Sequence, residues 1–166
     1  MEPNRLNLYY ISERYVEYLR KFDTRVLFNK NHTRPYVGIL YKYNGNNYFA
    51  PLSSPKPKHQ KMKKKAVDIW LIEDGKLGVI NFNNMIPCPI EELTEVIPTI
   101  KDVKYKLLLE NQLSSINKDR KIILKKLVHF HEQYNNKRLY PNVLDRCCDF
   151  RLLEKKCHDY IVDNAR

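Results

Sequence analysis

The sequence has no acidic residue between Asp23 and Asp68, although Asp and Glu account for 19 of its 166 residues. Residues 24–67 contain ten of the 30 Lys and Arg residues and therefore carry almost all of the formal net charge of +11. Positive charge gathered in one segment is typical of proteins that bind a nucleic-acid backbone. A lysine-rich face kept for solubility is the alternative, but solubility does not require the removal of carboxylates. The ten basic residues are Arg25, Lys30, Arg34, Lys42, Lys56, Lys58, Lys61, Lys63, Lys64 and Lys65.

Several common catalytic motifs are also absent. The chain has only four glycines and no Gly-rich phosphate loop, no His-Glu-x-x-His motif, and no pair of aspartates in its basic half that could hold Mg²⁺. Two-metal nuclease chemistry requires several carboxylates that converge on the ions. We therefore expect neither a metal nor a cofactor, and we expect any RNA cleavage by this chain to be metal-independent.

Cysteines and apolar runs give no sign of a metal site or a membrane span. The four cysteines show no Cys-x-x-Cys spacing, which predicts reduced thiols rather than zinc ligands or disulfides. No apolar run approaches the ~20 residues of a membrane span, and the first residues lack the apolar stretch of a signal peptide. We expect a cytoplasmic protein without membrane contact. Its length suits a single domain, taken as residues 1–166.

The first half of the chain reads as strands with one helix among them. Residues 6–11 are apolar and β-prone, and Ser12 is placed to cap a helix. Residues 35–43 and 46–52 predict a hairpin, because the intervening Asn44-Gly45 tolerates the positive φ angles of a tight turn. This hairpin would deliver the loop that follows its second strand to the surface.

The rest of the chain changes from strands to helices. Residues 67–72 and 76–81 predict a second hairpin, and residues 85–87 a last, short edge strand. Helices are expected over 104–117, from 118 to about 136, and from an Asp149 cap to Ile161. The second of these helices should bury Ile122, Ile123, Leu127, Phe130 and Tyr134 and expose His129 and His131. The order of elements predicts an α+β fold with an antiparallel sheet and a helical C-terminal half.

The loop Ser53-Ser-Pro-Lys-Pro-Lys-His59 is the strongest candidate for chemistry. Metal-free cleavage of RNA uses the 2′-hydroxyl of the substrate as nucleophile and leaves a 2′,3′-cyclic phosphate and a 5′-hydroxyl. The enzyme must align that hydroxyl, stabilise the phosphorane oxygens and move protons. Ser, Lys and His provide the groups for these tasks, and the prolines stiffen the loop. By composition alone, an exposed turn without function is the more frequent meaning of a Ser-Pro-Lys run.

Six short motifs are spread over nearly the whole chain. They are Leu-Tyr-Tyr-Ile-Ser (8–12), Tyr-Val-Gly-Ile (36–39), Tyr-Phe-Ala-Pro-Leu-Ser-Ser-Pro-Lys-Pro-Lys-His (48–59), Gly-Val-Ile-Asn (78–81), Met-Ile-Pro (85–87) and Cys-Asp-Phe-x-Leu-Leu-Glu (148–154). In type and in order they resemble the ToxN/AbiQ family, the endoribonuclease toxins of type III toxin–antitoxin systems, whose antitoxin is a structured, repeated RNA. The most specific of them is Pro-Leu-Ser-Ser-Pro-Lys within residues 48–59.

The resemblance implies a compact, strongly bent antiparallel sheet, related to the barrel core of the MazF/Kid-like ribonucleases and wrapped by helices. It implies metal-independent RNA cleavage, growth arrest or abortive phage infection, and a closed ring in which toxin alternates with an antitoxin RNA that the toxin also processes. Cellular or phage RNA would be the substrate. The family's catalytic Thr/Ser-Ser-x-Lys matches Ser53, Ser54 and Lys56. The expected RNA-binding residues are Lys30, His32, Arg34, Tyr36, Lys58, His59, Lys61, Lys63, Lys64 and Lys65. For Tyr36, packing in the core is an equal alternative.

Two other classes stay open at this point. A non-catalytic, basic RNA-binding module would share the charge pattern and the aromatic residues that can stack on bases. A DNA-binding protein is disfavoured, because no helix-turn-helix pattern falls in the basic segment. The sequence does not indicate the cleavage motif, the antitoxin sequence, the general base, or which residues of 29–36 enter the active site.

Overall fold

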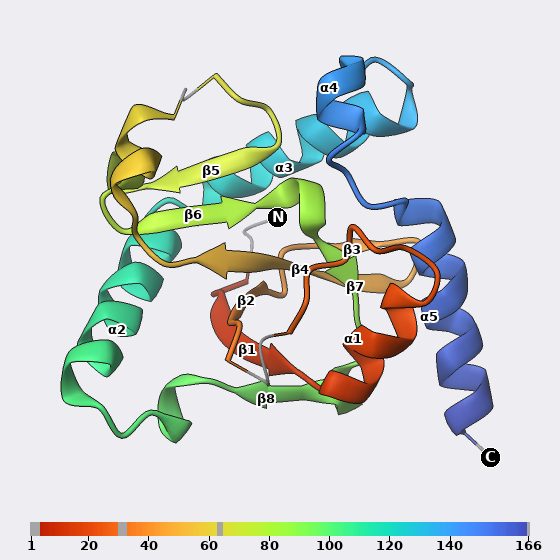
Figure 1. The fold of residues 1–166 in the computed structure, drawn as a ribbon, viewed down its shortest axis with the longest axis horizontal. Helices are drawn as coiled ribbons and strands as arrows, with labels where there is room; N and C mark the ends of the chain where they lie inside the picture. The colour runs from red at the N-terminus through yellow and green to blue at the C-terminus, as the bar shows by residue number, and fades with distance from the viewer. Residues whose placement is uncertain (1–3, 30–32, 63–64, 166) are drawn as a thin grey trace.

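The computed structural model describes residues 4–29, 33–62 and 65–165, which form an antiparallel sheet of eight strands covered by helices (Figure 1). The strands follow the order β5-β6-β4-β2-β1-β8, and β3 and β7 pair with β4 beside this path. Within the described residues β5 and β8 do not pair with each other, so the sheet is open rather than a closed barrel. The strands are β1 (Asn7–Ile11), β2 (Tyr36–Gly38), β3 (Lys42–Tyr43), β4 (Asn46–Ser53), β5 (Ile69–Ile72), β6 (Gly78–Asn81), β7 (Ile86–Pro87) and β8 (Leu93–Glu95).

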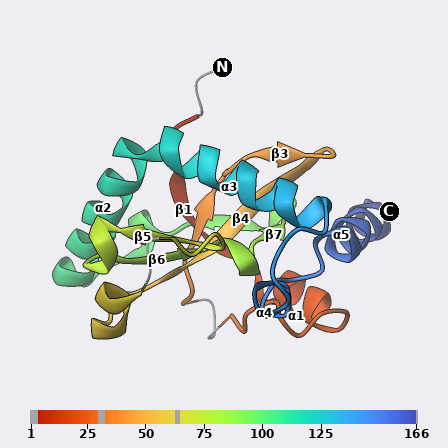
Figure 2. The same cartoon turned by 90° about the horizontal axis from the view of Figure 1, so that it is seen from above.

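The helices surround this sheet. Figure 2 shows α3 along one side of the sheet, α1 and α4 on the opposite side, and α5 at the end where β7 lies. The α+β class and the helical C-terminal half are thus confirmed. None of the helices in the described residues combines the length and the hydropathy that crossing a bilayer requires. The helices are α1 (Glu13–Arg20), α2 (Val103–Lys118), α3 (Arg120–Asn135), α4 (Pro141–Leu144) and α5 (Phe150–Asn164).

Side-chain caps start three of the helices, α1, α2 and α5, and two of these caps were predicted from the sequence. The Ser12 hydroxyl accepts a hydrogen bond from the backbone N–H of Tyr15 at 3.3 Å, which starts α1. Asp149 Oδ1 accepts one from the N–H of Leu152 at 3.2 Å, which starts α5. Both caps agree with the sequence-based prediction, since short polar side chains satisfy the free N–H groups of a first helical turn.

The central strand β4 exchanges partners along its length, and the sheet bends around it. Residues 46–47 pair with β3, 48–49 with β7, 50–51 with β2 and 52–53 with β6. The partners β3 and β2 lie on one edge of β4, and β7 and β6 on the other. Because each partner stays for only two residues, the two ends of β4 face different surroundings.

The predicted turn between β3 and β4 is present. Asn44 and Gly45 have φ angles of 50° and 78°, which suit a two-residue hairpin turn. The hairpin is attached to α5 through Glu154, whose carboxylate accepts hydrogen bonds from Tyr48 Oη at 2.7 Å and Asn44 Nδ2 at 3.2 Å. The hairpin tip therefore lies beside α5.

The structure corrects several predicted elements. The strand near residues 85–87 is not the last, because β8 follows it and pairs with β1. β8 has only three residues, two of which are exposed. The four-residue α4 was also missed, and α5 continues to Asn164 rather than ending at Ile161. Ile122 is 59% exposed, since α3 turns Ile123, Leu127 and Phe130 toward the core instead. Short elements with few apolar residues give little signal before they are packed.

Candidate active site

Ser53 is the last residue of β4 and is held by a neighbouring strand. It lies opposite Val79 of β6, and its hydroxyl accepts a hydrogen bond from Asn81 Nδ2 at 2.9 Å. Residues two apart on a strand share one face of a sheet, so Asn81 reaches Ser53 diagonally. The predicted catalytic hydroxyl is thereby oriented by an amide from a different hairpin.

The loop after Ser53 leads directly into the 3-10 turn η1 (Pro57–Lys61), which a histidine closes. The backbone N–H of Lys56 donates to His59 Nδ1 at 3.2 Å, and the N–H of His59 donates to the Lys56 carbonyl at 2.9 Å. Ser54 and Lys56 are exposed, whereas His59 is only 3% exposed. The two reciprocal bonds hold the backbone of Lys56 while its side chain faces solvent.

This geometry corrects the expectation that His59 binds RNA. Its ring is buried and its Nδ1 is an acceptor, so the ring orients the loop from beneath. Burial, followed by the charges of Lys58 and Lys56, lowers the pKa of His59 below its usual 6.5. A lowered pKa keeps the ring neutral near pH 7, which is the state that can accept the Lys56 N–H.

Two glycines allow the backbone to pack closely around this loop. A Cβ at Gly75 would lie 2.4 Å from the His59 carbonyl oxygen, and one at Gly78 would lie 2.2 Å from the Ser53 carbonyl oxygen. Both glycines have positive φ angles, of 91° and 111°, which side chains disfavour. The turn η2 (Glu73–Gly75) and the start of β6 therefore support the loop directly.

The segment before β2 runs beside the end of β4. The Leu52 N–H donates to the Pro35 carbonyl at 2.9 Å, so Arg34 comes next in line with Ser53. Arg34 Nε donates to the Phe28 carbonyl at 3.0 Å, which joins the two ends of this loop. The structure thus brings Arg34 to the candidate site. Lys30 and His32 lie outside the described residues.

Tyr36 does not reach the surface, which agrees with core packing, the alternative to the expected RNA contact. Its side chain is fully buried, and its hydroxyl has no hydrogen-bond partner in the described structure. Burial raises the pKa of this phenol, and the charge of Arg34 opposes that rise. All three residues of β2 are buried, so both faces of this strand are covered and Tyr36 is buried whichever face it occupies.

The basic segment is divided by the fold. Lys58, Lys61 and Lys65 are exposed at or after η1, while Lys63 and Lys64 lie outside the described residues. Lys42 lies on β3, near the hairpin tip beside α5 and away from the loop that follows β4 (Figure 1). Arg25 is bonded to Asp23, with Nε and Oδ1 3.0 Å apart. Among the described residues of this segment, the positive charge near Ser53 therefore comes from Lys56, the η1 lysines and Arg34.

Other candidate groups are placed elsewhere. The four cysteines are free and buried, so they pack in the interior. Across the described ranges no set of three or more His, Cys, Asp or Glu side chains is arranged to hold a metal ion. His131 is also buried, although the sequence placed it at the surface, and His129 is exposed as expected. His131 packs among aromatic rings that a helical pattern alone could not reveal.

Hydroxyls, a lysine ammonium and a nearby guanidinium are suited to a phosphodiester. Ser53, Ser54 and Lys56 stand on one short loop, and Arg34 lies beside its first residue. Such donors can bind phosphate oxygens and stabilise charge that develops on them. Asn81 was missed as a supporting residue, although it closes the Gly-Val-Ile-Asn motif at 78–81.

Comparison with known proteins shows the family to which this chain belongs. A family model described as toxin ToxN of type III toxin–antitoxin systems matches residues 7–158. The endoribonuclease ToxN of Bacillus thuringiensis subsp. kurstaki is 36% identical to this chain over an alignment of 163 residues. The alignment covers 90% of this chain and 81% of that protein.

Two solved structures share the fold. One is AbiQ, described as a lactococcal anti-phage endoribonuclease of a type III toxin–antitoxin system, with 30% identity, a TM-score of 0.81 and coverage of 95% of this chain and 98% of that chain. The other concerns a type III toxin inhibited by a non-coding RNA pseudoknot, with 31% identity, a TM-score of 0.79 and the same coverage. This chain therefore belongs to the ToxN family of toxins from type III toxin–antitoxin systems.

Proposed function

We propose that this protein is a metal-independent endoribonuclease that cuts RNA by attack of the 2′-hydroxyl on the adjacent phosphorus. The observation that carries this proposal is the double support of the Ser53–Lys56 loop, in which Asn81 orients a hydroxyl and His59 holds the backbone of Lys56. Preorganised donors that need no rearrangement during the reaction are the main source of electrostatic catalysis.

In the proposed reaction a bond forms between the 2′-oxygen and phosphorus while the bond to the 5′-oxygen breaks. The 2′-hydroxyl loses its proton and the departing 5′-oxygen gains one, so the products end in a 2′,3′-cyclic phosphate and a 5′-hydroxyl. Lys56 and Arg34 stabilise the negative charge on the non-bridging oxygens. The hydroxyls of Ser53 and Ser54 donate to the phosphate and align it with the attacking oxygen.

The proposal includes the partner and the setting. The toxin acts in the cytoplasm as one domain, on cellular or phage RNA. It is inhibited by a structured, repeated antitoxin RNA, pseudoknotted like the one that inhibits the similar toxin. The toxin processes this RNA and binds it in a closed ring of alternating protein and RNA. The exposed lysines at and after η1 make the phosphate contacts.

The test is cleavage of a single-stranded RNA by the purified protein in EDTA, followed by analysis of the fragment ends. Cleavage in EDTA with cyclic phosphate ends is expected. Activity that disappears in the chelator and returns with Mg²⁺ would contradict the metal-free mechanism. RNA binding without any cleavage would favour the second candidate, a non-catalytic RNA-binding module.

A further inference from the structure

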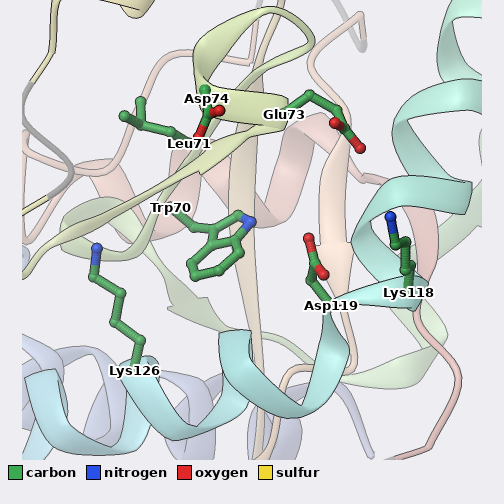
Figure 3. Close-up of a pocket in the computed structure, with 7 residues that line it drawn as sticks. All are labelled: Trp70, Leu71, Glu73, Asp74, Lys118, Asp119 and Lys126. Carbon is green, nitrogen blue, oxygen red and sulfur yellow. The ribbon is translucent and has the colours of Figure 1, made fainter.

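A pocket of about 340 Å³ opens on the side of η2 that faces the helices (Figure 3). One wall comes from β5 and η2, and the other comes from the junction of α2 and α3. None of the groups assigned to cleavage lies in it. Its lining residues are Trp70, Leu71, Glu73, Asp74, Lys118, Asp119 and Lys126.

The pocket contains the only tryptophan of the chain. Trp70 is half-buried, so part of its indole stays available to a ligand in the pocket. The Lys126 ammonium lies 5.9 Å from the centroid of the ring. Partial burial lowers the pKa of Lys126, and the negative charge of nearby Asp68 opposes this lowering. An exposed indole beside a cation suits a flat, electron-rich ring, because aromatic side chains stack on nucleobases with a gain of ~1–3 kcal/mol per base.

The carboxylates that line the pocket indicate which nucleobase it would bind. Figure 3 shows Asp119 and Glu73 on the side of the indole that bears its nitrogen, with Lys126 at the other side. Asp119 is the residue before α3, but its side chain accepts no hydrogen bond from the first turn of that helix, so its carboxylate oxygens are not used in capping. Glu73 Oε1 accepts a hydrogen bond from the Ser115 hydroxyl at 2.8 Å, which positions its carboxylate.

Such carboxylates accept hydrogen bonds and repel phosphate, so the pocket suits a base rather than a backbone group. Guanine presents two adjacent donors, N1–H and the N2 amino group, which match the two oxygens of one carboxylate. Adenine and cytosine each offer one amino group, and uracil offers a single ring N–H. Guanine is therefore the best match.

The turn η2 links one wall of the pocket to η1, which follows the proposed catalytic loop. Glu73 and Asp74 belong to η2, and Gly75 of the same turn packs against the His59 carbonyl in η1. An RNA strand that crosses η1 can therefore place a neighbouring base in the pocket. Lys118 and Lys126 also line the pocket, and their ammonium groups would attract the phosphates on either side of that base.

We propose that the Trp70 pocket binds one unpaired guanine of an RNA whose backbone contacts η1. The guanine stacks on Trp70 and donates its N1–H and N2–H to Asp119. This inference rests on the proposed function, because it assumes that RNA is the ligand of η1. It adds a base-selective subsite apart from the residues that act on the phosphate.

The single tryptophan makes the test specific. Quenching of Trp70 fluorescence reports on this pocket alone, so guanosine, adenosine, cytidine and uridine monophosphates can be titrated in turn. We expect saturable quenching by the guanosine nucleotide with an affinity at least tenfold above that of the uridine nucleotide. Asp119→Asn should remove most of this preference, and the matched control Asp145→Asn, at the exposed end of α4, should keep it.

Two longer probes separate the possible sources of the base. One is an unstructured 2′-O-methyl oligoribonucleotide with one guanine, which imitates a substrate. The other is an RNA pseudoknot with one unpaired guanine, which imitates an antitoxin. Tenfold weaker binding of either probe to Asp119→Asn supports the subsite and identifies its source.

The outcomes also separate this inference from the proposed function. Equal affinity for all four nucleotides, or an Asp119→Asn protein that binds like the wild type, overturns the guanine subsite even if RNA is cleaved in EDTA. Guanine-selective quenching by a protein that cleaves no RNA supports the subsite and rejects the endoribonuclease. Circular dichroism of each variant verifies that it is folded.

Discussion

The two ends of β4 show how one strand serves two different purposes. Tyr48 and Phe49, toward its beginning, are fully buried, and Tyr48 joins the strand to α5 through Glu154. Its last residue, Ser53, is half-exposed, and its hydroxyl is held by a hydrogen bond from Asn81. One end contributes stability through packing, and the other presents hydroxyls and lysines to solvent.

The aromatic end is packed far more densely than the proposed catalytic end. His131 lies 4.6 Å from Tyr43 and 5.5 Å from Phe150 between ring centroids, in a dense group of rings beside the hairpin. Packed rings of this kind bury large apolar areas and interact edge to face. The loop at the other end contributes little apolar burial, so its geometry depends on Asn81, His59 and the two close-packed glycines.

The largest effect is expected from Phe150→Ala at the aromatic end. Phe150 is fully buried and contacts Tyr48, Phe130 and Tyr134, so its truncation leaves a cavity. The free energy of unfolding should fall by about 3–5 kcal/mol, as measured by denaturant titration. The cleavage rate of the protein that remains folded should be unchanged. A large loss of rate per folded molecule would contradict the separation of the two ends.

Lys56→Ala should have the opposite effect: a large loss of cleavage rate and almost no change in stability. Loss of a donor to the developing phosphorane charge typically costs ~10²–10³ in rate, while an exposed side chain contributes little to stability. The rate of RNA cleavage and the denaturation midpoint measure the two effects. Lys42→Ala, an exposed lysine on β3 near the other end of the strand, is the matched control. Wild-type cleavage by Lys56→Ala would remove Lys56 from the site.

Acid should affect both ends, through different histidines. Burial lowers the pKa of His131 from 6.5 to about 4, so the unfolded chain takes up its proton first as the pH falls. The stability contributed by the neutral ring is complete above pH 6.5 and decreases below it, by roughly 2–3 kcal/mol at pH 4. Denaturation at pH 7 and pH 4 measures this loss, and His131→Phe should reduce it.

The pKa of His59 is also lowered from its usual 6.5, so its ring is neutral at pH 7 and becomes protonated only in acid below pH 6.5. Protonation removes the acceptor of the Lys56 N–H and should disorder the loop. A pH–rate profile should therefore show an acid limb that is weaker in His59→Asn, whose amide oxygen accepts without titrating. An identical limb in both proteins would assign the titration to another group.

Asn81→Ala should have a smaller effect, about tenfold in cleavage rate, since one neutral hydrogen bond contributes ~0.5–1.5 kcal/mol. If Asn81 acts through Ser53, the double variant with Ser53→Ala should be no slower than Ser53→Ala alone. Additive losses would mean that Asn81 contacts the RNA itself. Single-turnover rates of the four proteins complete the cycle.

The smallest effect concerns the lysines after the loop. Joint replacement of Lys61, Lys63, Lys64 and Lys65 by Gln should weaken RNA binding, because fewer counterions are released from the RNA. The slope of log affinity against log salt should become shallower by ~0.7–0.9 for each phosphate that the variant no longer neutralises. Cleavage at saturating RNA should persist, because the residues of the loop remain. An unchanged slope would show that these lysines are only solvated.

Much of the fold could be predicted because its signals are local. Asn44-Gly45 permits the turn wherever the strands pack, and Ser12 and Asp149 satisfy N–H groups within their own first helical turn. The consecutive hydroxyls, lysine and prolines of the Ser53–Lys56 loop made it a candidate, but its assignment as the catalytic loop came from the family resemblance and stays a prediction. Interactions within a few residues depend on the local sequence alone.

Packing between distant segments governs which polar and aromatic groups face inward. Tyr36, His59 and His131 all carry groups that bind RNA or water readily, and all three are buried by elements far away in the chain. The pairing of β8 with β1 and the reach of Asn81 to Ser53 likewise join distant segments. Burial depends on which elements cover a given face, and a periodic pattern shows only that a face exists. Most of the helices and strands therefore follow from the amino-acid order, whereas the assembled fold decides which polar and aromatic side chains stay at the surface.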